Sequence, residues 1–506
     1  MLTRLKKTFF EDKLIIDFIF YFILLSFCFK SFYYRWGYWI DQPIYHYMAW
    51  GFKNGMILYK DLIDMNFPGI ILINLLASFI YGSTQIGLRA LDMIFLFVFM
   101  ASSSIIFIQF KINWIIRILC MSSYFIAYIS TGISQTIQRE SYTVPLIILG
   151  LIPWITSFIK PEQRFSSWLW LLFGAIESIG LWIKPTPVLM TIFTILFCFI
   201  CTKERRVLFK YLLFYLTGIF LVSLAFLIWL YFIGSLDGFI TWCIKYNLEA
   251  NQYSAVPLIN KFKDTRFVIK HFFQPFCLMF LGLVLILVKS RFSAIRKNFL
   301  KEFIFVTGLF LSAFISIWIQ GKTYCVYHFI PFQATLAIMA GVILSEVCSE
   351  ILFRFKYLIL GFITICLVFV FQQSITLFEP DSCDARLGKY FNSILPKDKT
   401  VITFGILPVF FTAFERKTPF PFIFSAAMYS FSAKNQRYKR HIKHIFTKAL
   451  KEPSVSYFIT PKGLRNFLYK GNFQDQKLNS LGYEKVKLNT ECNSLYSIYK
   501  HKNTIN

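Results

Sequence analysis

Ionisable and hydrogen-bonding side chains gather at the ends of several long apolar segments in this sequence of 506 residues. Such groups are costly at the edge of a membrane unless they pair, reach the lipid headgroups or serve a site. A carboxylate placed there can accept a proton, and Lys, Arg or His can bind an anion. The candidates for this chemistry are Asp41, Gln138, Arg139, Glu140, Lys184, Lys322, Tyr327 and His328.

Each of these candidates also has a purely structural explanation. Asp41 precedes Gln-Pro-Ile, a favourable start for a helix that the aspartate could cap. Arg139 and Glu140 could pair with each other and cap their own segment. Lys184 could extend to the headgroups, and the Tyr-His pair of QGKTYCVYH could belong to an aromatic interface belt. Their clustering is therefore the stronger argument for a site.

The composition indicates which kind of structural element holds these residues in position. The chain is 57% hydrophobic, 20% aromatic and only 16% charged, and its mean hydropathy is positive. A soluble domain of this size would need more polar surface. Apolar runs long enough to cross a bilayer recur from Leu14 to Phe371, without the alternation of a β-barrel. The sequence therefore predicts a polytopic α-helical membrane protein, in which residues 14–29 are a retained span and not a cleaved signal.

Basic clusters between the apolar runs predict the orientation of the helices. The net charge of +27 is explained by these inward-facing loops and by a basic tail, without nucleic-acid binding. The N-terminus is expected inside, so Asp41 and the other polar candidates converge on the outer face. Eleven spans are predicted, at 14–33, 86–109, 114–131, 139–158, 167–183, 185–201, 209–234, 271–289, 302–319, 326–345 and 353–374.

Two domains are expected. Residues 1–374 form the transmembrane part, with outer loops at 34–85 and 235–270, and residues 68–82 are a short interfacial or re-entrant helix. Residues 375–506 are more polar and form a small α/β domain outside the membrane. Its predicted strands and helix lie at 400–406, 454–460, 494–500 and 436–450.

The eleven cysteines are scattered and mostly lie within spans, where Cys behaves as a small apolar residue. No spacing typical of a metal site occurs among them. Cys383 and Cys492 lie in the external domain, where an oxidising compartment would allow a disulfide. The sequence alone leaves that pairing open.

The first outer loop resembles that of the GT-C glycosyltransferases, in the branch of the protein O-mannosyltransferases and aminoarabinose transferases. TGISQTIQRE, IKPTP and KTYCVYHFIP also resemble segments of bacterial members, so the resemblance extends to about residue 375. Gln42 stands where many members carry a second acid. The matching positions of the first loop are Asp41, Tyr45, Ala49, Gly51, Gly55, Tyr59, Asp61, Phe67, Pro68, Tyr81 and Gly82.

The resemblance implies inverting transfer of a sugar from a polyprenyl phosphate to an acceptor hydroxyl at the outer surface. The acceptor class is a glycolipid, polysaccharide or protein. Asp41 would be the base that orients and deprotonates the hydroxyl. No metal or other cofactor is expected, and Asp41 and Glu140 are the alternative ligands if one is needed. Cations for the donor phosphate are Arg139, Lys184, Lys322 and His328, and further substrate contacts are Tyr45, Tyr59, Asp61, Gln138, Glu140 and Tyr327.

Two other functions stay open at this point. A transporter or flippase of a lipid-linked glycan would carry its polar groups near the bilayer midplane, often in two similar halves. A polysaccharide polymerase or ligase would use a large outer loop, and the loop 235–270 contains Trp242, Lys245, Tyr246, Asn251 and Arg266. ATP-binding and hydrolase motifs are absent from the sequence. Abundant Lys, Ile and Phe suggest an AT-rich bacterial genome and hence a plasma (inner) membrane.

Overall fold

The computed structural model describes most of the chain. By its contacts the chain divides into two compact units, which are treated separately below. The helical unit comprises Met1–Gly37, Ile80–Phe226 and Ser254–Phe378, and the mixed unit comprises Tyr38–Phe79, Leu227–Tyr253 and Glu379–Asn506. The described residues are 14–37, 41–82, 85–249, 299–320, 325–354, 383–405, 409–423, 435–462, 473–488 and 491–502, together with a few single positions.

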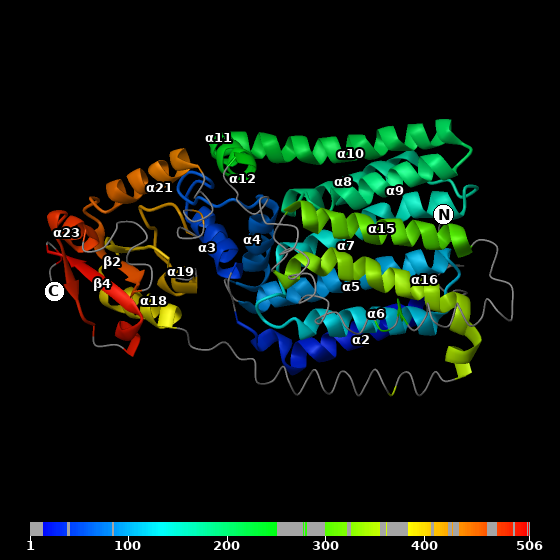
Figure 1. The fold of residues 1–506 in the computed structure, drawn as a ribbon, viewed down its shortest axis with the longest axis horizontal. Helices are drawn as coiled ribbons and strands as arrows, with labels where there is room; N and C mark the ends of the chain where they lie inside the picture. The colour runs from blue at the N-terminus through cyan, green and yellow to red at the C-terminus, as the bar shows by residue number, and fades with distance from the viewer. Residues whose placement is uncertain are drawn as a thin grey trace. The chain divides into compact units, whose positions relative to one another are not determined.

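Long apolar helices form the helical unit and run side by side (Figure 1). Neighbouring pairs along the chain, such as α7 with α8 and α15 with α16, are packed together. The helices are α2 (Leu14–Ser31), α5 (Gln85–Gln109), α6 (Trp114–Ser130), α7 (Arg139–Ile159), α8 (Ser167–Ile183), α9 (Val188–Cys201), α10 (Arg205–Phe232), α15 (Phe299–Gln320) and α16 (Ile330–Arg354), with 3-10 turns η1 (Tyr33–Arg35) and η4 (Val326–Phe329).

The predicted polytopic helical architecture is confirmed. Among the described residues, six helical stretches are long and apolar enough to cross a membrane, and four shorter apolar helices accompany them. Each predicted span that falls on described residues coincides with a helix, whereas 271–289 and 353–374 lie largely outside the description. The predicted boundary at 374/375 also lies outside it and stays a prediction.

Glycines allow α8 and α10 to cross at close range. A Cβ atom on Gly174 would lie 2.1 Å from the carbonyl oxygen of Tyr215, and one on Gly218 would lie 2.1 Å from that of Leu171. Small residues at such crossings allow backbones to pack closely where lipid supplies no hydrophobic drive between helices. Near the crossing, the aromatic ring of Trp170 stacks on Tyr211 at 4.7 Å between centroids.

A buried ion pair joins α2 to α6. The guanidinium Nε of Arg117 lies 2.6 Å from a carboxylate oxygen of Asp17, and both side chains are almost fully buried. The same guanidinium donates to the carbonyl of Ile112. Buried charges require such pairing, since a lone charge in an apolar environment costs several kcal/mol. The pair fixes the first predicted span against the third.

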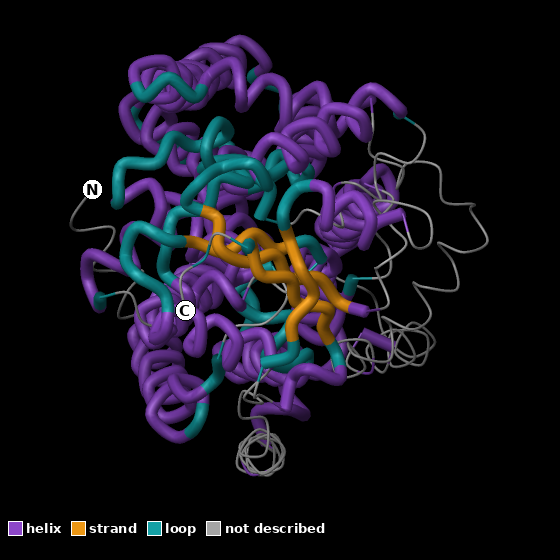
Figure 2. Tube along the Cα trace, turned by 90° about the vertical axis from the view of Figure 1, so that its left-hand side faces the viewer, coloured by secondary structure: helices purple, strands orange, loops and turns teal. Residues whose placement is uncertain are grey.

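The mixed unit contains a four-stranded sheet, drawn in orange in Figure 2. The strand order is β1-β2-β4-β3; β1 is parallel to β2, and β4 is antiparallel to β2 and β3. Phe458 packs on Phe446 of α21, and the adjacent Tyr457 packs on Phe391 of α18, because successive strand residues face opposite sides. The elements are β1 (Thr400–Thr403), β2 (Val455–Pro461), β3 (Tyr483–Val486), β4 (Tyr496–His501), α18 (Cys383–Ile394), α19 (Val409–Phe414), α21 (Gln436–Ala449) and α23 (Phe473–Ser480).

The predicted small α/β domain is thus confirmed, and strand β3 is an addition to the three predicted strands. Residues of both outer loops pack with this domain, within the mixed unit. They form α3 (Gln42–Lys53), α4 (Gly69–Tyr81), α11 (Leu236–Phe239), η2 (Ile240–Lys245) and α12 (Tyr246–Glu249). The predicted short helix at 68–82 therefore exists as α4, while its depth in the membrane stays a prediction.

The second outer loop contributes core residues to the mixed unit. Trp242 and Tyr246 are buried and pack against Phe422 and Tyr438. This packing explains two of the aromatic residues that the polymerase or ligase interpretation relied on. Asn251 and Arg266 of the same loop lie outside the described residues.

We predict that Cys383 and Cys492 form a disulfide in an oxidising compartment. The two are free thiols in the structure, and the Cys492 Sγ lies 3.7 Å from the carbonyl oxygen of Cys383. Burial and the neighbouring Cys383 thiol raise the pKa of Cys492 to about 11, so oxidation should be slow at neutral pH and faster in alkaline buffer. Closing a loop of about 110 residues should stabilise the fold by about 4–5 kcal/mol.

Peptide mapping under non-reducing conditions tests this prediction. A cross-linked peptide containing both cysteines is expected, together with a lower unfolding midpoint for Cys492→Ser and no further decrease on adding Cys383→Ser. Complete alkylation of both thiols in protein isolated from an oxidising compartment would contradict it.

Candidate functional site

Three ionisable side chains from separate parts of the sequence meet in the helical unit. Glu140 lies in the first turn of α7, Lys184 follows the last residue of α8, and His328 lies in η4. The Glu140 carboxylate pairs with Lys184 and with the His328 ring through the same oxygen, Oε1. The Lys184 Nζ lies 2.9 Å from Nδ1 of His328. We refer to Glu140, Lys184 and His328 as the charged triad.

The charged triad is shielded from solvent. The exposed fraction of the residue is 0% for Glu140, 4% for Lys184 and 1% for His328. Removal from water strengthens each electrostatic contact and makes any missing partner expensive. The suggestion that Lys184 extends to the headgroups is therefore wrong, because its ammonium is buried against Glu140. A pair with Arg139 alone also does not account for Glu140, because its carboxylate bonds to Lys184 and His328.

A second buried network, which the sequence analysis missed, adjoins the start of α7. Arg89 and Asp92 lie one turn apart on α5, and both are fully buried. The Arg89 guanidinium donates to the carbonyl of Gly37 at 2.9 Å, to that of Trp36 at 3.3 Å, and to the hydroxyl of Tyr33 at 3.0 Å. Two ionisable residues inside an apolar helix were the signal that could have identified it.

Asp92 connects this network to the segment that precedes Glu140. Its carboxylate accepts hydrogen bonds from the hydroxyls of Tyr33 and Tyr128. The Tyr128 oxygen lies 2.8 Å from the Ser141 hydroxyl and accepts the backbone N–H of Ile137 at 3.1 Å. Ile137 has a φ of 50°, a conformation that is unfavourable for a β-branched residue and needs support from its surroundings. The network therefore fixes the turn from which α7 starts.

The other predicted residues of this unit that the structure describes are chain neighbours of Glu140 and His328. Gln138 is buried at the N-cap position of α7, where its amide donates to the carbonyl of Ser134, and Arg139 is partly exposed. Tyr327 is buried, and its backbone N–H donates to Gln135. Its ring lies against the ring of His328, with 4.2 Å between centroids. Lys322 lies outside the described residues.

The other predicted residues belong to the mixed unit. Asp41 is partly exposed at the N-cap position of α3, yet its side chain makes no capping bond, so capping does not explain the residue. Tyr45 is buried on α3. Tyr59 has a φ of 60° and donates its hydroxyl to the carbonyl of Asn66, and the Asp61 carboxylate accepts the N–H of Ile57. The predicted convergence of these residues with the triad stays a prediction.

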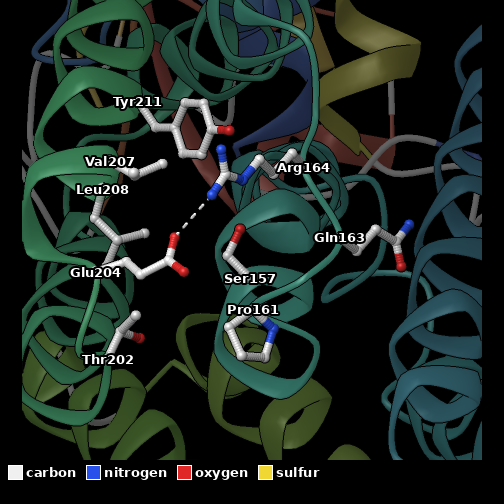
Figure 3. Close-up of a pocket in the computed structure, with 9 residues that line it drawn as sticks. All are labelled: Ser157, Pro161, Gln163, Arg164, Thr202, Glu204, Val207, Leu208 and Tyr211. Atoms are coloured by element: carbon white, nitrogen blue, oxygen red, sulfur yellow. Dashed lines mark hydrogen bonds and ion pairs between the residues drawn. The ribbon is translucent and has the colours of Figure 1, made fainter.

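A small cavity lies at the opposite end of α7 from the triad. Its volume is about 10 Å³, which is enough for about one water molecule. Arg164 and Glu204 point toward each other across it (Figure 3), 3.3 Å apart and with 65% and 50% of their side chains exposed. Exposed pairs of this kind contribute little, and the space cannot hold a sugar or a phosphate. We therefore do not regard it as the site.

No cluster of three or more His, Cys, Asp or Glu side chains suited to a metal ion occurs in the part of the chain that the structure describes. Within the triad, the Glu140 oxygen already has two nitrogen partners. Metal independence stays a prediction.

We predict that Glu140→Gln destabilises the protein by about 3–5 kcal/mol, because it leaves Lys184 charged and buried without its counter-ion. Adding Lys184→Met should restore most of the loss, since the buried charge is then removed. The midpoint of thermal unfolding of purified protein in detergent measures both effects.

Glu204→Gln provides the matched control. It breaks the exposed pair with Arg164 and should change stability by no more than about 1 kcal/mol. Equal effects of the two glutamine variants, or a Glu140→Gln protein as stable as the original, would contradict the buried ion pair.

Comparison with known proteins finds similarity in structure alone. No family profile and no curated sequence matches the chain. ArnT from Cupriavidus metallidurans, solved bound to undecaprenyl phosphate, superposes with a TM-score of 0.62 at 10% identity, covering 95% of this chain and 97% of ArnT. The oligosaccharyltransferase of Archaeoglobus fulgidus, solved with Zn and sulfate, gives a TM-score of 0.50 at 13% identity, covering 93% and 71% of the two chains. These similarities show that the chain shares the fold of these two proteins, which agrees with the fold class expected from the resemblance to GT-C glycosyltransferases.

Proposed function

We propose that this protein is a membrane glycosyltransferase that moves a sugar from a polyprenyl-phosphate carrier to an acceptor. The GT-C fold supports a transferase, and ArnT, one of the proteins that share this fold, was solved with undecaprenyl phosphate bound. The observation that carries the proposal is the charged triad, where Lys184 and His328 are fixed by a buried carboxylate. Buried, fixed cations are what a departing phosphate requires.

The charge of the triad suits a phosphate better than a neutral ligand. Glu140 offsets one positive charge, and Lys184 together with the adjacent Arg139 leaves the local sum positive. Because Glu140 also orients Lys184 and His328, a phosphate would meet donors that need little reorganisation. Their role in this proposal is to bind the donor phosphate and stabilise it as it leaves.

Asp41 is the proposed base. A hydroxyl is a poor nucleophile, so a carboxylate within about 2.6–3.2 Å must orient it and accept its proton as the glycosidic bond forms. The nucleophile attacks the anomeric carbon from the face opposite the phosphate, which leaves with the bonding electron pair and inverts the configuration. Asp41 is partly exposed, and accessibility to the acceptor is what this role requires.

We also propose an orientation. In this proposal the N-terminus is in the cytoplasm and the mixed unit is outside a bacterial plasma (inner) membrane, which the basic loops support by the positive-inside rule. Asp41 and Lys184 would then both lie at the outer surface, where a lipid-linked donor presents its sugar.

We predict that Asp41→Asn abolishes sugar transfer, with a loss of at least about 100-fold, while binding of the lipid-linked donor stays within about twofold. The asparagine keeps the shape of the side chain but cannot accept the proton. Transfer from a radiolabelled polyprenyl-phosphate sugar and donor binding are measured on the same preparation in nanodiscs.

Asp237→Asn is a suitable control, because Asp237 is an exposed aspartate of the same unit. Its transfer rate should equal that of the original protein. An Asp41→Asn enzyme with normal turnover would remove the base assignment, and loss of donor binding in that variant would indicate a role in binding instead.

We predict that transfer continues undiminished in excess EDTA. The leaving phosphate departs as an anion that protein cations can stabilise, so no metal is required for its activation. Initial rates with and without EDTA, and after adding Mg²⁺ or Mn²⁺, provide the measurement. A loss that a divalent cation reverses would contradict this prediction and make Asp41 and Glu140 the first ligands to test.

A further inference from the structure

A groove of about 1040 Å³ lies within the mixed unit, and none of the residues that line it belongs to the charged triad. Small-molecule sites typically enclose about 300–1,000 Å³, so this one has room for a ligand larger than a single sugar. One side is formed by the C-terminal end of α3 and the loop after it, and the other by the turn between α18 and β1 and by residues 415–421. Asp61, a predicted substrate contact, is part of its lining.

Arg416 holds one wall of the groove in place. Its guanidinium donates to the backbone carbonyls of Asn392, Leu395 and Lys399 at 2.8–3.0 Å, which are acceptors at and after the end of α18. Neighbouring Glu415 has a φ of 45°, a strained conformation for a residue with a side chain. An arginine bound to several carbonyls and a strained residue beside it indicate a wall with a defined shape.

Trp50 gives the groove an aromatic surface. Its ring is partly exposed and stacks on Tyr47, with 5.4 Å between centroids and 16° between planes. Tyr47 is in turn fixed by its hydroxyl, which donates to the carbonyl of Arg416 at 2.7 Å. The Trp50 ring is therefore held in one orientation by the Tyr47 ring on which it stacks. Aromatic faces held in this way bind the C–H faces of sugar rings and combine apolar area with low entropy cost.

Positive charge predominates along the lining. Lys60, Lys397 and Lys417 are exposed there, and Lys399 and Arg416 also belong to it. The lining carboxylates are those of Asp61, Asp398 and Glu415, and that of Asp61 already accepts a backbone N–H. The sum of five cations and three carboxylates is +2. Lysines attract acidic groups, and the interspersed carboxylates can accept hydrogen bonds from sugar hydroxyls.

We propose that this groove binds an acidic oligosaccharide, whose sugar units carry carboxylate or phosphate groups, as the glycan part of the acceptor. The assignment as acceptor rests on the proposed transferase function, whereas the binding itself does not. Nucleic acid fits less well, because three carboxylates would face its continuous row of phosphates. A membrane surface fits less well, because the lining is concave and Trp50 is inside it.

The first experiment measures binding without any transfer. Tetragalacturonic acid is the acidic probe and maltotetraose the neutral one, each titrated calorimetrically into the full-length protein in detergent. We expect the acidic tetrasaccharide to bind at least tenfold more tightly than the neutral one, and the preference to weaken with salt. Equal affinity for the two probes would overturn the proposal.

Two triple variants locate the binding site. Lys60→Gln, Lys397→Gln and Lys417→Gln together remove the exposed lysines of the groove, and binding should fall at least tenfold. Lys451→Gln, Lys485→Gln and Lys487→Gln remove the same charge from exposed positions elsewhere in this unit and should change binding less than twofold. Equal losses in both triples would show attraction by net charge alone and overturn the site.

Further measurements separate the remaining outcomes. Trp50→Ala should weaken binding and Trp50→Phe should restore part of it; an unchanged Trp50→Ala affinity would overturn the aromatic contact. Vesicles of phosphatidylglycerol are the competing probe. If the protein binds these vesicles through the three groove lysines and does not bind the tetrasaccharide, the glycan assignment is overturned in favour of membrane docking. The calorimetric titrations need no sugar transfer, so failure of the transfer assay and loss of tetrasaccharide binding are separate results.

Discussion

The guanidinium of Arg89 cannot reach water, and its hydrogen bonds must all be made inside the protein. Its acceptors include the carbonyls of Trp36 and Gly37, which directly follow η1. It also contacts the hydroxyl of Thr136 in the segment before α7. Two chain segments far apart in sequence are thereby attached to α5. In a low-dielectric environment the loss of this arginine would remove the donor to both carbonyls at once.

The charged triad depends on that attachment. Glu140 follows Ile137 by three residues, and the strained turn at Ile137 is held by Tyr128, which Asp92 orients. A small change in this turn would shift the start of α7 and with it the carboxylate that positions Lys184. The polar network around Arg89 therefore supports the segment that carries Glu140. The role proposed for the triad needs such support, since functional geometry requires neighbours whose own positions are fixed.

The sequence predicted the features that depend on local composition and periodicity. The long apolar runs predicted the helices, and the strand-length run at 454–460 predicted β2. Both predictions succeeded because the length and the apolar character of an element can be read from consecutive residues. Strand β3 was missed, since Tyr483–Val486 is short and half polar. The partner of Lys184 was also beyond local reasoning: Glu140 and His328 lie 44 and 144 residues away, and only packing brings them together. Arg89 was accessible in principle, as an arginine inside an apolar helix.

The location of buried charge also bears on the transporter alternative. A transport path requires polar groups near the bilayer midplane that water or substrate can reach. Glu177 lies near the middle of the apolar helix α8. It is fully buried, and its carboxyl is bonded to the hydroxyls of Thr191 and Tyr215. Gly150 packs directly against it, so this acid joins helices to one another. The triad, by contrast, lies where α7 starts and α8 ends, a position suited to chemistry at a membrane surface and not to passage across it.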